Sequence, residues 1–217
     1  MRTPGKPATH TLLLLITLTS VPATAEDLET LVVSATRSAV PASQLSNSIR
    51  TLSSEELEMI GAVHISEALA RVPGTWINRG NGQENLTAIR SPVFTGAGSC
   101  GAFYIAEDGV PIRPPGVCNV NELSEINCEQ AARIEVLRGP GTAVHGSNAQ
   151  HGVINVISMP PPDTARAASL SLEGGANEYA RLLGSYGEAH PGQAWRLSIN
   201  AAHDGGYKDD SGFDQQK

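Results

Sequence analysis

Short runs in which apolar and polar residues alternate recur along this chain, and they predict β-strands. Residues 132–137 read Ala-Arg-Ile-Glu-Val-Leu and end in Arg-Gly-Pro at 138–140, whereas residues 153–157 are apolar apart from one asparagine. Alternation is typical of a strand with one buried face, and a short apolar run is typical of a fully buried strand. Asp108-Gly109 separates two further runs and favours a type I′ hairpin turn between them. The predicted strands are 49–52, 86–90, 103–107, 110–112, 133–137, 153–157, 169–173 and 195–200.

Two short helices are predicted between residues 53 and 74. Ser53 and Glu56 have the spacing of a capping box, in which each side chain bonds the main chain of the other residue, and Gly61 suits the left-handed end of a helix. Apolar residues then recur at helical spacing until Pro73-Gly74, which ends the second helix. His64 begins that helix, and we expect it to be solvated rather than to bind a metal.

The first 25 residues predict an export signal rather than a membrane anchor. Arg2 and Lys6 precede an apolar run at 12–18, and Ala23-Thr24-Ala25 has the small-residue spacing of a cleavage site. The run is much shorter than the about 20 apolar residues that a spanning helix needs. Since no later segment is long and apolar enough for such a helix, any membrane span is expected to consist of strands.

Composition and motifs argue against two other classes of protein. A formal net charge of −7 disfavours nucleic acid as a partner, because phosphate binding needs clustered Lys and Arg. Residues 141–147 have the glycine spacing of a P-loop but lack the Lys before Ser, so a secreted P-loop hydrolase is disfavoured. Gly-x-Ser-x-Gly is also absent. The sequence therefore predicts no enzyme, no metal site and no resident cofactor.

Three features of the sequence together resemble the end of the plug domain of TonB-dependent outer-membrane receptors. They are the strand 132–137 with its Arg-Gly-Pro ending, the pair Gly146-Ser147, and the strand that follows Gly152. The stretch "ISEALARVPGTWIN" and the Asp108-Gly109 hairpin resemble further plug motifs. The strand ending in Ile89-Arg90 also resembles one, although Ser91 replaces the usual Gly. The resemblance implies an α+β plug domain, a small mixed sheet with short helices, followed by the first strands of a transmembrane antiparallel β-barrel.

The resemblance runs from about Leu31 to the last residue and divides the chain into four parts. We expect a signal peptide at 1–25, a TonB box with its linker at 26–42, the plug at 43–162 and the start of the barrel at 163–217. The last part has room for about four strands, whereas the smallest barrels need 8. The barrel is therefore expected to be incomplete, and the chain a fragment or a truncated product.

By the same resemblance, the function is that of a receptor in the bacterial outer membrane. It would import a scarce ligand, most commonly a ferric siderophore, with energy from TonB and its inner-membrane complex, and its barrel would contact outer-membrane lipid. The TonB box would add a strand to TonB by β-augmentation, and it comprises Leu31, Val32, Val33, Ser34 and Ala35. The alternative is a soluble periplasmic ligand-binding or interaction module built on a plug-like domain. A barrel-encoding continuation after Lys217 would separate the two.

The resemblance also implies roles for two further sets of residues. Arg79, Gly80 and Asn81 occupy the first apical loop of the plug, where relatives contact their ligands. Arg90 and Arg138 match the family's arginines that pair with glutamates of the barrel wall and latch the plug. A charge in the barrel lumen needs such a partner.

Three cysteines remain to be assigned. An oxidising periplasm favours pairing. Cys100 and Cys118 flank the Asp108-Gly109 hairpin, whose antiparallel arms would bring them together, so we expect a Cys100–Cys118 disulfide. A Cys118–Cys128 bond is the open alternative.

Overall fold

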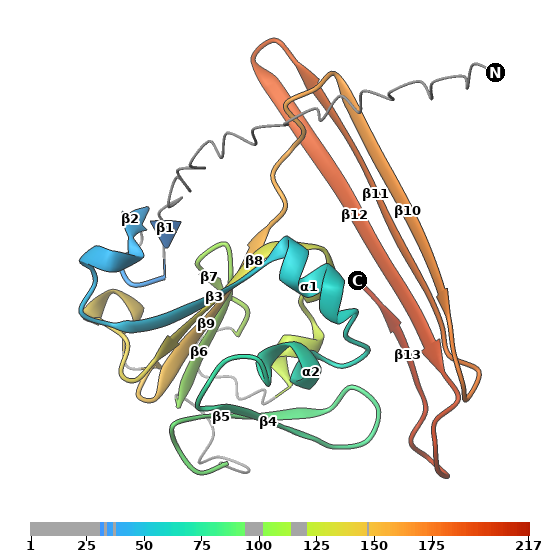
Figure 1. The fold of residues 1–217 in the computed structure, drawn as a ribbon, viewed down its shortest axis with the longest axis horizontal. Helices are drawn as coiled ribbons and strands as arrows, with labels where there is room; N and C mark the ends of the chain where they lie inside the picture. The colour runs from blue at the N-terminus through green and yellow to red at the C-terminus, as the bar shows by residue number, and fades with distance from the viewer. Residues whose placement is uncertain (1–30, 33, 37, 94–101, 114–120, 147) are drawn as a thin grey trace, which may run out of the picture.

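A five-stranded mixed sheet, here called the central sheet, forms the middle of the protein (Figure 1). The computed structural model describes residues 31–217 except 33, 37, 94–101, 114–120 and 147. Only the β6–β9 pair is parallel in this sheet. All the strands of this sheet were predicted, most of them from the alternation of residue types and β9 from its apolar run. In spatial order they are β3 (Ser48–Ser53), β8 (Ala131–Arg138), β9 (Gly152–Ser158), β6 (Phe103–Glu107) and β7 (Val110–Pro111).

Both faces of the central sheet are buried, because successive side chains of a strand point to opposite faces. Val136 and Ile154 belong to the larger core, which the helices α1 (Ser54–Ile60) and α2 (Ile65–Leu69) cover. The 3₁₀ turns η3 (Glu122–Ser124) and η4 (Cys128–Gln130) complete this layer. Leu137 and Val153 belong to a smaller core on the second face.

The second face is covered by residues 31–45, here called the N-terminal segment. This segment contains β1 (Leu31–Val32), which pairs antiparallel with β2 (Val40–Pro41), and the turn η1 (Ala42–Gln44). Ala35 and Leu45 pack against Leu137 and Val153, and the turn η5 (Ala143–His145) lies beside them. The chain therefore crosses the sheet before it contributes its first central strand.

The capping signals that predicted the first helix are confirmed, but the second helix is shorter than predicted. The Ser53 hydroxyl accepts a hydrogen bond from the Glu56 amide, and Glu56 accepts one from the Ser53 amide, so the capping box is confirmed. Gly61 ends α1 with φ +56°. α2 stops at Leu69 rather than reaching Pro73, because Arg71 and Val72 donate to carbonyls three residues back in tighter turns.

One hairpin forms an edge of the central sheet, and a second hairpin is a separate two-stranded sheet. Asp108 and Gly109 have φ +50° and +80°, as a type I′ turn requires at both central positions, so the predicted hairpin between β6 and β7 is confirmed. The second hairpin joins β4 (Thr75–Arg79) to β5 (Asn85–Ile89). Only its second strand was predicted, because the exposed Trp76 between Thr75 and Ile77 hides the alternation.

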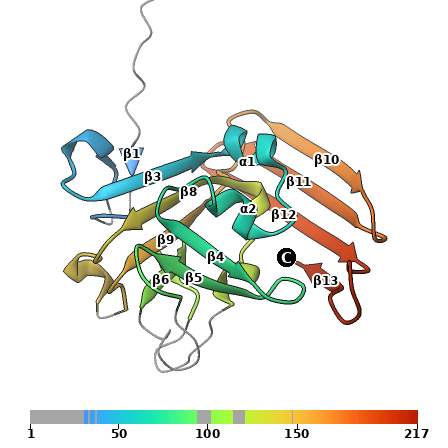
Figure 2. The same cartoon turned by 60° about the horizontal axis from the view of Figure 1, so that its bottom comes forward.

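Residues 166–216 form an open antiparallel sheet beside the plug, here called the C-terminal sheet. Its strands are β10 (Arg166–Gly174), β11 (Ala180–His190), β12 (Gln193–Asp204) and β13 (Phe213–Gln216), in that order. Figures 1 and 2 both show it on the side of α1, away from β1. β11 was not predicted, because Gly184 and Gly187 interrupt its apolar pattern, and the four-residue β13 was not predicted either.

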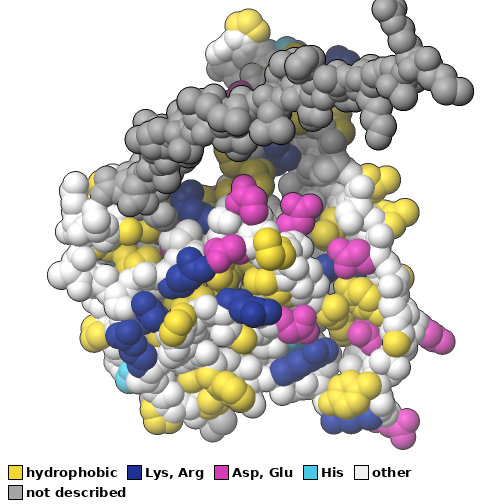
Figure 3. Space-filling model, in the orientation of Figure 1, with side chains coloured by type: hydrophobic (Ala, Val, Ile, Leu, Met, Phe, Trp, Pro, Cys, Tyr) yellow, Lys and Arg dark blue, Asp and Glu magenta, His cyan; other side chains and the backbone are white. Residues whose placement is uncertain are grey.

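The two faces of the C-terminal sheet differ sharply in polarity. Leu170, Leu172, Leu197 and Ile199 share the outer face and are 47–72% exposed. Apolar side chains accordingly protrude along the margin of this sheet in Figure 3. The inner face carries Ser169, Ser171, Arg196 and Ser198 towards the plug. This polarity, apolar outside and polar inside, is that of a membrane barrel. Separately, no helix within the described residues is both long and apolar enough to cross a membrane.

Candidate functional site

The predicted TonB box lies docked on the plug. Leu31 and Val32 pair with Pro41 and Val40, and Val32 is completely buried. Ala35 is buried in the smaller core, where its carbonyl accepts a 3.0 Å hydrogen bond from the Thr142 hydroxyl. Val33 lies outside the described residues. The main chain of this segment is therefore engaged with the plug rather than presented to a partner.

A buried carboxylate holds the middle of this segment. Glu135 of β8 is fully buried, and its Oε2 accepts hydrogen bonds from the Ser34 amide (2.8 Å) and the Ser34 hydroxyl (2.6 Å). Its Oε1 lies 2.8 Å from Arg133 Nε on the same strand. A buried charge is costly without such partners, so these contacts explain how β8 tolerates a Glu at its centre.

The predicted ligand-contact residues form a tight turn at the end of the β4–β5 hairpin. The Gly80 amide donates to the Glu84 carbonyl (3.1 Å), and the Asn81 amide donates to the Glu84 carboxylate (3.2 Å). Arg79 lies 4.0 Å from Glu67 of α2 and stays partly exposed. A Cβ on Gly82 would lie 3.2 Å from Phe213 Cβ, so this turn abuts the C-terminal sheet.

The His64 side chain contacts this turn at the Glu84 carbonyl. The prediction that His64 is exposed to solvent is wrong. The side chain is 1% exposed. Nδ1 accepts a hydrogen bond from the Ser66 amide (3.1 Å) and so caps α2, while Nε2 lies 3.2 Å from the Glu84 carbonyl. Burial, assisted by the charge of Arg79, lowers the pKa of His64 and favours a neutral ring. The sequence carried no signal for this, because histidine is not a usual N-cap residue.

The two predicted latch arginines lie near one another on the plug. Arg90 donates to the Ser48 hydroxyl (3.1 Å), and Arg138 donates to the Pro73 carbonyl (3.0 Å). Within the described part of the chain, neither has a carboxylate within 4.0 Å, and Arg138 Nε is buried without a hydrogen-bond partner. Burial lowers the pKa of Arg138, and the charges of Arg90 and Arg50 add to this effect. The cluster thus carries positive charge that an acidic partner would stabilise.

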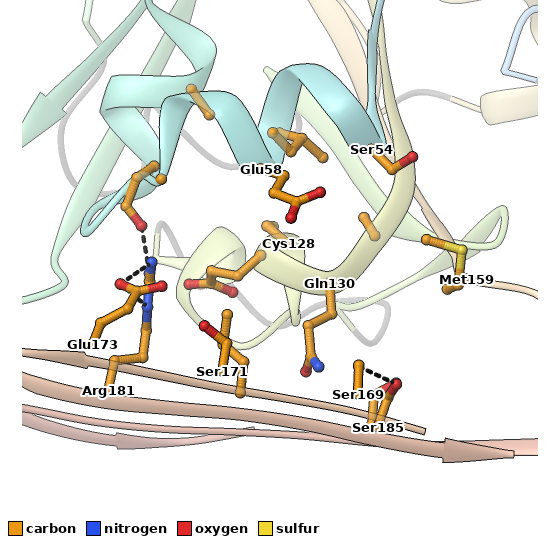
Figure 4. A pocket seen from close by; sticks show the side chains of 18 of the residues that line it. Ser54, Glu58, Cys128, Gln130, Met159, Ser169, Ser171, Glu173, Arg181 and Ser185 are labelled. Atoms are coloured by element: carbon orange, nitrogen blue, oxygen red, sulfur yellow. Dashed lines mark hydrogen bonds and ion pairs between the residues drawn. The ribbon is translucent and has the colours of Figure 1, made fainter. Parts of the chain in front are cut away.

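A cavity of about 550 Å³ separates the helical layer of the plug from the C-terminal sheet (Figure 4). Glu173 and Arg181 form an ion pair of 2.7 Å at one end, and Arg181 also donates to the Ala62 carbonyl (2.5 Å). Gln130 reaches across to the Gly184 carbonyl (3.0 Å). These contacts hold the plug and the first strands together around a cavity that both polar and apolar side chains line.

Cys128 lines the same cavity and is a free, buried thiol. Burial raises its pKa to about 12, so it is not a reactive thiolate at neutral pH. Cys100 and Cys118 lie outside the described residues, and their disulfide stays a prediction. Within the described residues, no group of His, Cys, Asp and Glu has the arrangement of a metal site.

Comparison with known families agrees with this geometry. A family model described as the TonB-dependent Receptor Plug Domain matches residues 41–153. The chain belongs to this family. Membership confirms the predicted recognition and the bacterial outer-membrane location, and the family is one of receptors rather than of enzymes.

Three solved structures share the fold. The pyoverdine receptor FpvA from Pseudomonas aeruginosa matches with a TM-score of 0.65 and 18% identity, over 82% of this chain and 25% of that one. The siderophore receptor PiuA from Acinetobacter baumannii matches with a TM-score of 0.57 and 21% identity, over 76% of this chain and 22% of that one. The alcaligin receptor FauA from Bordetella pertussis matches with a TM-score of 0.62 and 17% identity, over 80% of this chain and 29% of that one. The chain thus spans less than a third of each receptor, and the predicted fold class, a plug followed by barrel strands, is confirmed.

Proposed function

We propose that the chain is the plug and the first barrel strands of a receptor that imports a ferric siderophore with energy from TonB. The observation that carries the proposal is the position of Leu31, Val32, Ser34 and Ala35: a short strand and the turn after it are docked on a domain that matches the plug family. The solved structures with this fold include receptors whose names state siderophores, and they support the choice of cargo. We assign 1–25 to a signal peptide, 26–42 to the TonB box and linker, 43–162 to the plug and 163–217 to the barrel.

TonB would bind Leu31–Ala35 by adding a strand. Main-chain hydrogen bonds would provide the grip, and force on the chain would run along the strand direction. The segment suits this role because it is short and begins with a two-residue strand, Leu31–Val32, which pairs only with β2 among the described residues.

The ligand would bind at the turn formed by Arg79, Gly80 and Asn81. Figure 1 shows the β4–β5 hairpin at the end of the protein away from β1, so ligand and TonB would act at opposite ends of the plug. Arg79 keeps part of its guanidinium exposed, and a guanidinium suits carboxylate or other anionic oxygen atoms on a chelate.

Arg90 and Arg138 would hold the plug against acidic residues of the barrel wall. The positive charge around Arg138 supports this role. A glutamate close to Arg138 would reduce its repulsion with Arg90 and Arg50, and it would accept a hydrogen bond from the unpaired Arg138 Nε–H. The alternative of a soluble periplasmic module is disfavoured by the outer face of the C-terminal sheet. Leu170 and Leu172 are 70% and 72% exposed there, which suits lipid better than water.

An uptake assay tests the proposal. The complete reading frame that contains this chain is expressed in a bacterium that lacks its own siderophore receptors, and import of radiolabelled iron is measured with a panel of ferric siderophores. We expect import of at least one of them, lost when TonB is deleted. Absence of TonB-dependent import across the panel, with the product found soluble in the periplasm, would instead support the binding module.

A further inference from the structure

The contact between Ser34 and Glu135 is more elaborate than packing of the N-terminal segment requires. The two residues are 101 positions apart, and one carboxylate oxygen accepts both the amide and the hydroxyl of Ser34. On the same face of the sheet, Leu137, Val153 and Ala106 are apolar and bury Ala35 without any charge. An apolar residue at 135 would avoid the cost of burying a carboxylate. The charge therefore points to a function of the contact itself.

The contact occupies the groups that strand addition needs. β-Augmentation requires free main-chain N–H and C=O groups along the added strand. Here the Ser34 N–H is bonded to Glu135, and the Ala35 carbonyl is bonded to Thr142. Val32 is buried, and β1 is already paired with β2. In this docked form, the Ser34 N–H and the Ala35 carbonyl are not available to another strand.

We propose that Glu135 is a clasp that holds the TonB box on the plug and sets how often the box is available to TonB. The inference rests on the proposed function, because it takes residues 31–35 as the TonB-binding segment. Hydrogen bonds to a carboxylate are stronger than those between neutral groups, so the two bonds from Ser34 to Glu135 attach the segment firmly.

Arg133 makes the clasp reversible. Its Nε lies 2.8 Å from Glu135 Oε1, on the oxygen that Ser34 does not use, and its side chain is 29% exposed. When Ser34 leaves, the carboxylate keeps this partner, and water can reach the vacated oxygen along the departing segment. Release therefore does not require β8 to leave the central sheet.

The experiment measures exposure of the segment and TonB binding separately, on the purified chain. Hydrogen exchange followed by mass spectrometry reports the amides of residues 31–36, and titration with the periplasmic domain of TonB reports binding. The variants are Glu135→Gln, which keeps the shape, and Ser34→Ala, which removes only the hydroxyl bond. Val136→Ala is the matched control, because it truncates a buried side chain of the same strand on the opposite face.

We expect exchange of residues 31–36 to rise about tenfold in Glu135→Gln and less in Ser34→Ala. TonB binding should tighten in the same order. Val136→Ala should lower overall stability without changing exchange in this segment selectively. Wild-type exchange at residues 31–36 in both Glu135→Gln and Ser34→Ala would overturn the clasp. Faster exchange without TonB binding by any variant would support the clasp and overturn the TonB-box assignment.

Discussion

Lys217 Nζ lies 3.1 Å from Glu129 Oε1, and this pair joins the end of the C-terminal sheet to η4 of the plug. The Lys217 side chain is only 5% exposed, so this partner offsets the cost of burying its ammonium group. Gln215 donates to the Ser124 carbonyl (3.0 Å) nearby, which places the end of the sheet firmly on the plug.

Glu129→Gln should therefore loosen the C-terminal sheet while the plug stays folded. The substitution leaves a buried ammonium without its counter-charge, at a cost of about 3 kcal/mol. Limited proteolysis should then cleave first within 160–217 and faster than in the wild type. The exchanged pair Glu129→Lys with Lys217→Glu should restore resistance, and equal cleavage of all three proteins would contradict the role of the ion pair.

Val32→Pro should abolish TonB binding and uptake in the receptor made from the complete reading frame, while ligand binding persists. Proline removes a main-chain donor from the proposed added strand. TonB-domain titration and ligand binding are measured on the same preparation. Thr36→Pro, just beyond the box, is the control for a proline in this segment. Uptake equal to that of the wild type in Val32→Pro would rule out the TonB-box assignment.

Much of the fold could be predicted because its signals are local. The capping box of Ser53 and Glu56 and the turn at Asp108-Gly109 each depend on residues a few positions apart. Hydrophobic alternation, and the apolar run of β9, located the central strands for the same reason. β11 was missed because glycines replace the side chains that would carry its pattern.

The site was harder to predict because its contacts are distant in sequence. The burial of His64 depends on the Glu84 carbonyl 20 positions away, and the partner of Ser34 lies on β8. No rule of spacing connects such residues. The roles of Arg79, Arg90 and Arg138 came from family resemblance alone, and they stay predictions.

His64 should make the plug less stable as the pH falls. Burial lowers the pKa of His64 in the folded chain, so the unfolded chain binds the proton more readily. Its stabilising contribution is present above the unfolded value of about 6.5 and is lost as the pH falls through the lowered folded value. His64→Asn keeps an N-cap side chain without the titration. The difference in unfolding free energy between the two proteins should change between pH 7 and 5, and parallel curves would contradict this assignment.

Glu122 should make the plug less stable as the pH rises, which is the opposite of the effect of His64. Burial raises its pKa to about 7, although Arg113, 3.6 Å away, opposes the shift. The folded chain therefore binds the proton more readily, and this contribution to stability is lost as the pH rises from about 4.5 to 7. Glu122→Gln, which stays neutral, should gain melting temperature relative to the wild type at pH 8 but not at pH 4.5. An unchanged difference across this range would show that Arg113 compensates the buried carboxylate fully.

The thiols give a prediction that separates the two possible pairings. Cys128 is buried in η4, with its Sγ 3.9 Å from the Leu123 carbonyl, and it is far less accessible to an oxidant than a surface thiol. Export to an oxidising compartment should therefore join Cys100 to Cys118 and leave Cys128 reduced. Mass spectrometry of the non-reduced, exported chain should identify the linked peptides, with Cys128 alkylated only after unfolding. Cys128→Ser should leave the bond intact, whereas Cys118→Ser should leave Cys100 free. A Cys118–Cys128 peptide would contradict this pairing and would require the buried Cys128 thiol to turn out of its core.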